Sequence, residues 1–297
     1  MRVFVTGASG YIGGSVAASL ARDGHVVRGL VRSAEKEAAV RALGIEPVAG
    51  SLDDRALLLE EARGADAVVN AASSDHRPAV EALLEGLRGT DKVFLHTSGS
   101  SIVADNACGD VASLAIFDDD HRPAPVPERA ARVAIDRLVV AAGASGVRAA
   151  VLCNTLIYGD GLGPHRDSIQ VPMLVAQARK SGVARHVGRG LNIWSTVHVE
   201  DMVDLYRLAL VKAPHGAFMF VENGEASFRD MAAAIAHALG VAGPEPWPVE
   251  EAAAEWGLAR AVHTLGSNCR VRGPRARQLG WQPRRPPVLA WIEGNVR

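Results

Sequence analysis

The chain has 297 residues, of which 48% are hydrophobic and 22% are charged, so it is long enough to bury a substantial core. Its formal net charge of −1 leaves no global field that would favour nucleic acid or an anionic membrane surface as a partner. No uncharged apolar run approaches the roughly 20 residues that a bilayer-spanning helix needs, so we expect no membrane insertion.

The cysteines indicate a reducing compartment. Cys108, Cys153 and Cys269 are odd in number and far apart, which does not suit a disulfide framework. The chain also begins with a strand pattern and not with a signal peptide, so we expect a cytoplasmic protein. Neither the cysteines nor the histidines show the spacing of a metal site, and we expect no metal.

Short β-branched runs alternate with turns and helical stretches from the start of the chain. This alternation is typical of βαβ units around a parallel sheet. The nearly continuous apolar strands suit a sheet that helices cover on both faces, so we predict an α/β fold with a doubly wound Rossmann sheet. The five expected strands are Arg2–Thr6, His25–Val31, Ile45–Ala49, Ala67–Ala71 and Lys92–Thr97.

The alternation stops at Gly99–Pro127, where Gly, Asp and Pro predict a long loop of the functional or mobile kind. A helix over Glu128–Ala142 and a strand over Val147–Cys153 follow. The next segments have mixed periodicity and predict a smaller C-terminal cap. Its expected helices are Val171–Lys180, Val199–Leu210, Phe228–Leu239 and Val249–Trp256.

We therefore expect two domains. Residues 1–155 would form a dinucleotide-binding domain and residues 156–297 a smaller substrate-binding region. Part of 184–212 would return to the first domain. Near the end of the chain, a basic cluster is expected to be a solvated surface; its members are Arg270, Arg272, Arg275, Arg277, Arg284 and Arg285.

A spaced-glycine motif joins the first strand to the first helix, and this position gives the motif its meaning. Gly7 permits a tight turn, Gly10 lets the backbone approach a pyrophosphate, and Gly13 allows close packing of helix and strand. The free N–H groups at the helix N-terminus attract the same anion. The residues expected at the diphosphate are Gly7, Ser9, Gly10, Tyr11, Ile12 and Gly13.

The end of the second strand predicts the kind of dinucleotide. NAD-selective sites usually carry Asp or Glu there, whereas Arg accommodates a 2′-phosphate. This chain has Arg32, whose planar charged fork suits phosphate, and Ser33, whose hydroxyl can donate a hydrogen bond. We therefore predict NADP(H) in preference to NAD(H).

Three segments together resemble the short-chain dehydrogenase/reductase superfamily, in its extended or atypical epimerase-like branch. They are Thr6–Gly13, the Ile-Tyr-Gly of residues 157–159, and the Val-His-Val-Glu-Asp of residues 197–201. The ending Leu279–Pro283 is similar to the tail of that branch. The resemblance implies further cofactor contacts, with Ser51 and Leu52 beside the adenine, Asn70, Ala71, Ala72 and Ser73 along the pyrophosphate and ribose, and Thr97, Asn154 and Thr155 toward the nicotinamide.

The chain departs from the resemblance at the catalytic pair. The family usually carries Tyr-x-x-x-Lys on the helix after the fifth strand, where the Tyr delivers a proton. The tyrosines of this chain are Tyr11, Tyr158 and Tyr206, and none has a Lys four residues later. If Asp136 takes the place of the family's helix acid, Glu128 and Arg132 occupy the Tyr and Lys positions.

Several groups remain as catalytic candidates. An Arg one helical turn away lowers the pKa of a carboxyl, so Glu128 beside Arg132 would be a better base than acid, or the two would form a simple surface ion pair. Ser98 and Ser100 are the other candidates, because the family's polarising hydroxyl should fall near them. The expected substrate-side residues are Tyr158, His165, Arg166, Trp194 and His198.

Two functions stay open. The first is an NADP(H)-dependent oxidoreductase or epimerase/dehydratase-like enzyme acting on a small carbonyl or alcohol substrate. The second is a non-catalytic NADP(H)-sensing regulatory protein that retains the nucleotide site without the tyrosine. The resemblance also implies a homodimer formed by the helices near Val80–Leu87 and Arg132–Val140.

Overall fold

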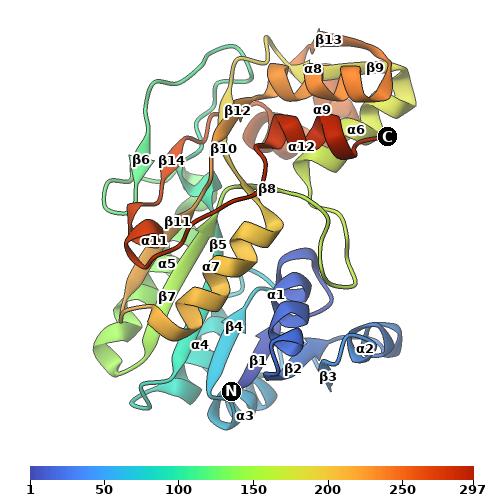
Figure 1. Ribbon diagram of the computed structural model, residues 1–297. Coiled ribbons are helices and arrows are strands. Elements are labelled where there is room, and N and C mark those ends of the chain that lie inside the picture. The colour runs from blue at the N-terminus through green and yellow to red at the C-terminus, as the bar shows by residue number, and fades with distance from the viewer.

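A computed structural model describes residues 1–297, and a seven-stranded sheet lies at its centre (Figure 1). All neighbouring strands of this sheet run parallel. Across the sheet the strands are β11 (Ala217–Val221), β7 (Arg148–Asn154), β5 (Val93–Gly99), β4 (Ala67–Asn70), β1 (Arg2–Thr6), β2 (Val26–Val31) and β3 (Glu46–Ala49). The direction of winding reverses between β1 and β4, which is where open sheets of this kind bind ligands.

Helices cover both faces of the sheet and bury its β-branched side chains. One face carries α1 (Tyr11–Arg22), α2 (Ala34–Arg41) and α7 (Val199–Lys212). The other carries α3 (Arg55–Gly64), α4 (Arg77–Leu87) and α5 (Pro127–Ala141). The predicted doubly wound Rossmann fold is thus confirmed. None of the helices combines the length and apolar composition needed to cross a bilayer.

A smaller region lies beyond the carboxyl ends of the strands, at the top of Figure 1. Its parallel pair β9–β13 packs against α8 and α6, and the C-terminal helix α12 packs on α8. The elements of this cap are α6 (Gln170–Ser181), β9 (Val183–Val187), α8 (Phe228–Leu239), β13 (Ala242–Trp247), α9 (Val249–Trp256), α10 (Leu258–Arg260), a π-helical turn (Ala261–Leu265) and α12 (Val288–Asn295).

Short elements connect the two parts. Three strands form a small sheet, namely β8 (Leu156–Tyr158), β10 (Ile193–His198) and β12 (Glu225–Ser227). Within the expected loop Gly99–Pro127 the structure has a 3-10 turn at Ser100–Val103 and a strand, β6 (Phe117–Asp118). The remaining elements are β14 (Val271–Arg272), which pairs with β6, α11 (Pro274–Gln278) and a 3-10 turn at Ala142–Ser145.

Strand β11 is an element that the sequence pattern did not predict. It is a short apolar run, fully buried, which adds a parallel strand beside β7. Its outer edge is covered by Asp119, a residue of the long loop, which accepts hydrogen bonds from Phe220 N–H at 2.7 Å and Arg275 N–H at 2.9 Å. An exposed sheet edge invites pairing with other chains, so this carboxylate also protects the fold. Burial raises the pKa of Asp119 to about 6.

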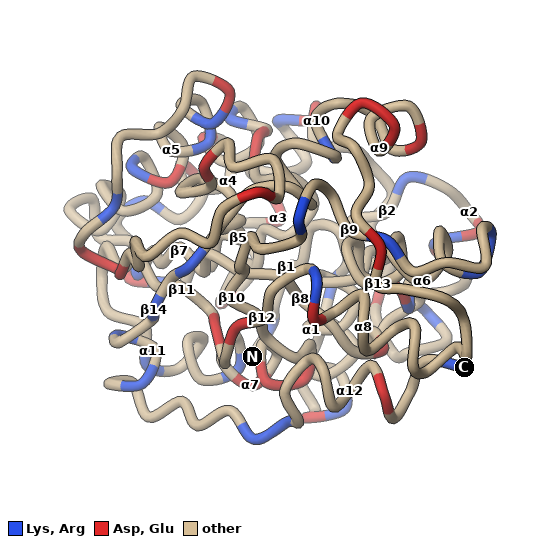
Figure 2. Tube along the Cα trace, turned by 90° about the horizontal axis from the view of Figure 1, so that it is seen from above, with Lys and Arg blue, Asp and Glu red and all other residues tan.

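The C-terminal tail is fixed to the start of α7. Asp201 accepts the backbone N–H groups of Arg284 at 2.8 Å and Arg285 at 3.0 Å. The indole N–H of Trp281 donates to the carbonyl of Asp201 at 2.8 Å. Residues about 80 positions apart in the chain are therefore held together, and the Val-His-Val-Glu-Asp segment and the tail form one structural unit. Basic and acidic residues are interspersed along the chain, as the coloured trace of Figure 2 shows.

Candidate functional site

A cleft of about 540 Å³ lies at the carboxyl ends of β1 to β4. It contains nine of the predicted cofactor contacts and one predicted substrate residue, His165. The others that line it were not singled out in the sequence. The lining residues are Gly7, Ser9, Gly10, Leu30, Val31, Arg32, Lys36, Ser51, Leu52, Asp53, Ala71, Ala72, Ser73, His76 and His165.

The glycine turn forms the floor of this cleft. Gly7 has φ +72°, and a Cβ on it would lie 2.8 Å from the carbonyl oxygen of Ala71. A Cβ on Gly13 would lie 2.5 Å from the Gly7 carbonyl oxygen, whereas one on Gly10 would have its nearest neighbour at 3.3 Å. Gly7 and Gly13 are therefore required by the fold, whereas Gly10 leaves room for a ligand.

Helix α1 begins at Tyr11, and its N-cap, Gly10, provides no side-chain cap. The N–H groups of the first turn, including those of Ile12 and Gly13, have no partner within the helix and are free for an anion. The residues present thus fit the diphosphate of a dinucleotide. Tyr11 itself donates its hydroxyl proton to the Gly159 carbonyl at 2.7 Å and holds the neighbouring loop.

Two cations stand beside the cleft after β2. Arg32 is exposed and Lys36 is half-buried, and both line the cavity. Ser33 is the N-cap of α2, and its hydroxyl oxygen accepts a hydrogen bond from Lys36 N–H at 3.4 Å. Lys36 was not among the predicted cofactor contacts, although a Lys in the first helical turn after Arg32 was a usable signal.

The far end of the cleft is closed by Ser51, Leu52 and a histidine. His76 Nε2 lies 3.0 Å from Asp53 Oδ1, while His76 Nδ1 accepts the N–H of Ala79 and so caps α4. The pair Asp53–His76 therefore connects the loops after β3 and β4 at the place expected for the adenine.

A buried hydrogen-bonded chain begins directly under the glycine turn. Thr6 Oγ1 accepts the N–H groups of Ala71 and Ala72, so its own proton goes to Asn70 Oδ1 at 2.6 Å. The Asn70 amide then donates to His96 Nδ1 at 3.0 Å. Because Nδ1 must accept, the hydrogen of a neutral His96 ring sits on Nε2. Asn70 is thus 1% exposed and belongs to the core, not to the cleft surface.

The same chain ends on α5. His96 Nε2 lies 3.8 Å from Asp136 Oδ1, which is too long for a hydrogen bond, and both atoms are buried without a partner. The other oxygen, Asp136 Oδ2, accepts the hydroxyl proton of Ser98 at 2.9 Å. Burial raises the pKa of Asp136 to about 7 and, with the nearby Arg132, lowers the pKa of His96 to about 4. Asp136 was not among the residues predicted to be catalytic.

Arg132 does not pair with Glu128. Its guanidinium forms a bidentate pair with Asp75 at 2.8 and 2.6 Å and donates to Ser101 Oγ at 3.3 Å. The hydrogen bond from Arg132 lowers the pKa of Asp75. Arg132 therefore ties the loop after β4 to the loop after β5. Glu128 is exposed in the first turn of α5, and no ion pair to Arg132 forms.

The remaining residues expected near the nicotinamide lie at the ends of β5 and β7. The hydroxyl of Tyr206 bonds to Thr97 Oγ1 at 2.8 Å and accepts from the Asn154 amide at 3.0 Å, which leaves Asn154 Oδ1 buried without a partner. Thr155 donates to the carbonyl of Val221 at 2.8 Å. Ser100 is 1% exposed and accepts the Cys269 thiol proton at 3.1 Å.

The five predicted substrate residues divide into two groups. Tyr158, Trp194 and His198 are buried, and none of them lines the cleft. His198 caps α7 by accepting Glu200 N–H at 3.2 Å and packs edge-on against the ring of Tyr158. His165 and Arg166 are exposed on a glycine-rich loop that packs against α1; His165 lines the cleft and Arg166 pairs with Asp160.

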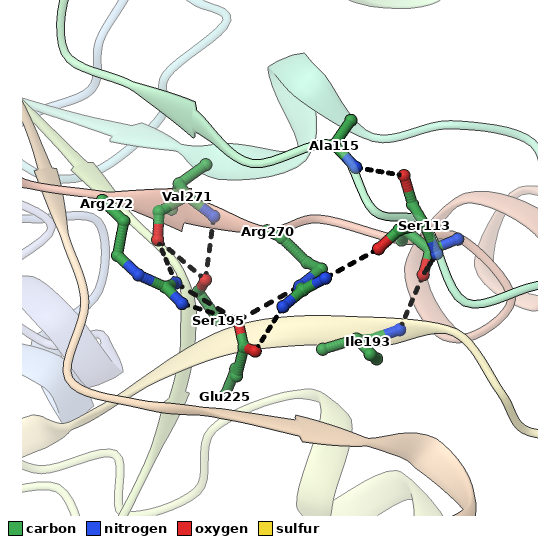
Figure 3. Close-up of polar contacts among 9 residues, drawn as sticks. Ser113, Ala115, Ile193, Ser195, Glu225, Arg270, Val271 and Arg272 are labelled. Atoms are coloured by element: carbon green, nitrogen blue, oxygen red, sulfur yellow. Dashed lines mark hydrogen bonds and ion pairs between the residues drawn. The ribbon is translucent and has the colours of Figure 1, made fainter.

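The expected solvated surface is confirmed at Arg284 and Arg285, which are exposed, and is wrong at Arg270. The Arg270 side chain is only 14% exposed, and its guanidinium pairs with Glu225 at 2.6 Å and donates to the Ser113 carbonyl at 2.8 Å. Arg272 pairs with the same carboxylate at 3.1 Å, as Figure 3 shows. One carboxylate from β12 thus neutralises two arginines, and these side chains join the long loop to the C-terminal segment.

A family model and several relatives match most of the chain. A model of the NAD dependent epimerase/dehydratase family matches residues 3–219. The chain is 32% identical over 337 residues to the oxidase ucsJ of an Acremonium species, covering 100% of this chain and 97% of that one. It is 28% identical over 323 residues to a 4-hydroxy-2-methyl-3-oxo-4-farnesyl-3,4-dihydroquinoline-1-oxide ketoreductase of Stigmatella aurantiaca, covering 96% and 92%.

Solved structures share the fold across the whole chain. A dTDP-glucose 4,6-dehydratase of Bacillus anthracis, crystallised with NAD, superposes with a TM-score of 0.76 at 17% identity and covers 100% of this chain and 97% of that one. Such a likeness concerns the fold. The activity has to be argued from the site.

Proposed function

The chain belongs to the NAD dependent epimerase/dehydratase family, and from that premise we propose that it is an NADP(H)-dependent oxidoreductase acting on a small carbonyl or alcohol substrate. The observation that carries the proposal is the cleft in which an uncapped helix N-terminus and the glycine turn face two cations, Arg32 and Lys36. This arrangement offers one subsite for a diphosphate and a second for an additional phosphate.

The cation pair supports NADP(H) over NAD(H). A carboxylate at the end of β2 would favour the free ribose hydroxyls of NAD, and the position is occupied by Arg32 instead. Lys36 approaches the same place from the first turn of α2. Two positive charges without an acidic neighbour in hydrogen-bond contact favour a ligand group that carries two negative charges.

The other end of the cleft supports the orientation of the cofactor. NADPH, when bound, would supply the hydride. Asn154 Oδ1 is a buried acceptor without a partner, and an amide N–H₂ group is the kind of donor that would satisfy it. Arg132, held by Asp75, would bind ribose hydroxyls or the substrate oxygen, and hydroxyls at the end of β5, such as Ser98, are the candidates for proton delivery.

The names of the relatives support a carbonyl as the substrate. One of them is named as a ketoreductase, a name that describes the reduction of a carbonyl group. An epimerase or dehydratase reaction also begins with a hydride transfer, so the site residues do not separate these reactions. We propose carbonyl reduction because a ketoreductase aligns over nearly the whole chain.

The test uses purified protein, NADPH and a panel of aldehydes, ketones and nucleotide sugars. Loss of the absorbance of the reduced cofactor in the presence of one carbonyl class is expected, together with calorimetric binding of NADPH that is stronger than binding of NADH. Absence of binding to both nucleotides would remove the proposal. Binding without turnover would favour the alternative below.

The alternative is an NADP(H)-sensing regulatory protein. Two observations favour it. The Tyr-x-x-x-Lys pair is missing from the sequence. In addition, Ser98 and Ser100 are only 3% and 1% exposed, so a substrate would have little access to their hydroxyls. A sensor would bind NADPH and change its contacts with a partner, without consuming the cofactor. The turnover panel separates the two functions.

We further propose a homodimer and a cytoplasmic location. A groove of about 510 Å³ runs between α4 and α5, with Leu84 and Leu138 in its wall, and would be covered by the same helices of a second copy. The three cysteines are free thiols, which suits a reducing compartment. Light scattering that gives a monomer would remove the dimer.

A further inference from the structure

The end of α5 nearest the nicotinamide subsite lacks a tyrosine, but a buried carboxyl lies two helical turns along the same helix. Asp136 is 3% exposed, and one of its oxygens accepts a hydrogen bond from Ser98. Its other oxygen has no partner and faces the Nε2 of His96 at 3.8 Å. A buried polar group without a partner is costly and calls for an explanation.

The chain of bonds under the glycine turn fixes the hydrogen of His96 on Nε2, the atom nearest to Asp136. The ring therefore presents N–H to Asp136 Oδ1, while Ser98 occupies Oδ2. In this environment the carboxyl can pass between its acid and its carboxylate form by a rotation of the Ser98 hydroxyl alone. As a carboxylate it accepts from Ser98, with the His96 N–H nearby at 3.8 Å, and as an acid it donates to Ser98.

A second cavity connects Asp136 with the outside. It has a volume of about 400 Å³, room for roughly a dozen waters, and runs along α5 on the side of β11. It shares no lining residue with the dinucleotide cleft. Asp136 lines it together with Val133 on α5, Phe218 on β11 and the charged residues Asp120, Arg122 and Arg137.

We propose that Asp136 supplies the proton of the reduction to Ser98, in the role that the family gives to its tyrosine, and that the cavity along α5 returns this proton from solvent. This inference rests on the proposed function. The contact between Ser98, which is 3% exposed, and the substrate oxygen is part of the proposal. Asp136 acts through Ser98 and is therefore a positioning residue.

The proton balance closes without another reactant. As the carbonyl carbon is reduced, the Ser98 O–H bond breaks and an O–H bond forms on the substrate oxygen. Ser98 then takes the proton of the Asp136 carboxylic acid, which becomes a carboxylate. Water in the cavity along α5 returns one proton to Asp136. The bound cofactor and substrate would exclude water from the cleft, so a separate route for this proton is useful.

The charges around Asp136 set the pH range. Burial raises its pKa to about 7, while the bond from Ser98 and the positive charges of Arg132 and Arg122 act in the opposite direction. At that value a large fraction of the carboxyl is protonated near neutrality, as an acid catalyst needs. The titratable and charged groups that face it are His96, Arg132, Asp75, Cys153, Arg122, Asp120 and Arg137.

The test compares Asp136→Asn with wild type, using the most active carbonyl of the panel. We expect kcat of the wild type to fall above about pH 7 and kcat of the variant to be about 100-fold lower and independent of pH in that range. Asp204→Asn is the control, because its carboxyl pairs with Arg207 on α7 and lines neither this cavity nor the dinucleotide cleft. Its pH profile should equal that of wild type.

Two further measurements distinguish loss of proton transfer from a general loss of activity. Ser98→Ala leaves Asp136 in place and breaks the transfer, and Ser98→Ala combined with Asp136→Asn should be no slower than the slower single variant. Independently of turnover, infrared spectroscopy should show the carbonyl stretch of a protonated carboxylic acid that disappears as pH rises through about 7 in wild type and is missing in Asp136→Asn.

The outcomes separate the two levels of the proposal. Wild-type turnover with an unchanged rate and pH profile in Asp136→Asn would overturn the proton supply alone. Strictly additive losses in the double variant would also overturn it. Absence of turnover by the wild-type protein would overturn the proposed function and, with it, this inference.

Discussion

The dinucleotide cleft and the buried network under it are built in different ways. The diphosphate end comes from one continuous segment, the glycine turn that runs from β1 into α1, and uses mostly backbone N–H groups. The buried network comes from the ends of β4 and β5 and from α5, and it consists of side chains such as Asn70, His96 and Asp136, none of which lines the cleft. Function that depends on backbone geometry is therefore local, whereas function that depends on side-chain chemistry is assembled across the fold.

The largest effect is expected at the turn. Gly13→Ala would bring a methyl group 2.5 Å from the Gly7 carbonyl oxygen, so we expect the free energy of unfolding to fall by about 1–3 kcal/mol and NADPH binding to be lost. Gly10→Ala has its nearest neighbour at 3.3 Å, so it should keep the fold and weaken NADPH about 100-fold. Urea unfolding and calorimetry measure the two quantities. Equal stability loss in both variants would contradict the separation of fold and ligand roles.

The next effect concerns the phosphate subsite. Arg32→Asp should lower the affinity for NADPH relative to NADH by about 100-fold, since charge-assisted bonds are lost and a like charge is added. Lys36→Ala should lower the same ratio by about 3- to 10-fold. Arg41→Ala, on α2 and outside the cleft, is the control. An unchanged ratio in Arg32→Asp would show that this end does not select the cofactor.

A third effect is the pH dependence of the free energy of unfolding, to which the buried groups Asp136 and His96 contribute. The pKa of Asp136 is raised by burial to about 7, so between about pH 4 and pH 7 the folded protein holds a proton that the unfolded chain releases, and stability falls as pH rises. His96, whose pKa is lowered by burial to about 4, acts in the opposite direction up to about pH 6.5.

The two contributions nearly cancel in the wild type, and Asp136→Asn removes one of them. We expect the free energy of unfolding of the variant, relative to wild type, to rise with pH by at most about 1.4 kcal/mol per unit between pH 4 and pH 7. Urea titrations at a series of pH values measure this difference. A difference independent of pH would mean that Asp136 is ionised throughout the range.

The last effect concerns the buried chain of hydrogen bonds that starts at Thr6. Thr6→Val keeps the shape of the side chain but removes the acceptor of two N–H groups and the donor to Asn70. We expect a loss of about 1–3 kcal/mol in the free energy of unfolding. Thr155→Val removes a single bond, to the Val221 carbonyl, and should cost less. If Thr155→Val lowered the free energy of unfolding more than Thr6→Val, the hydrogen bonds of Thr6 would not stabilise the fold more than a single buried bond does.

The sequence by itself determined the α/β class, most of the strands of the main sheet and the glycine turn. These features follow from local causes, because β-branched runs, helix starts and positive φ at Gly7 depend on residues that are close in the chain. Arg32 could be predicted as a phosphate-binding residue for the same reason, because it directly follows the second strand. The short apolar strand β11 was missed, because a five-residue run has no periodicity that separates it from other buried segments.

The tertiary structure decided the rest. In the folded chain Arg132 pairs with Asp75 and not with Glu128. Tyr158, Trp194 and His198 lie outside the dinucleotide cleft. Ser98, His96 and Asp136 come together in one buried network. None of these partners is a sequence neighbour, so no spacing rule relates them. Packing removes water from such groups, and burial then sets both their hydrogen-bond partners and their pKa values, which is why only the folded chain reveals them.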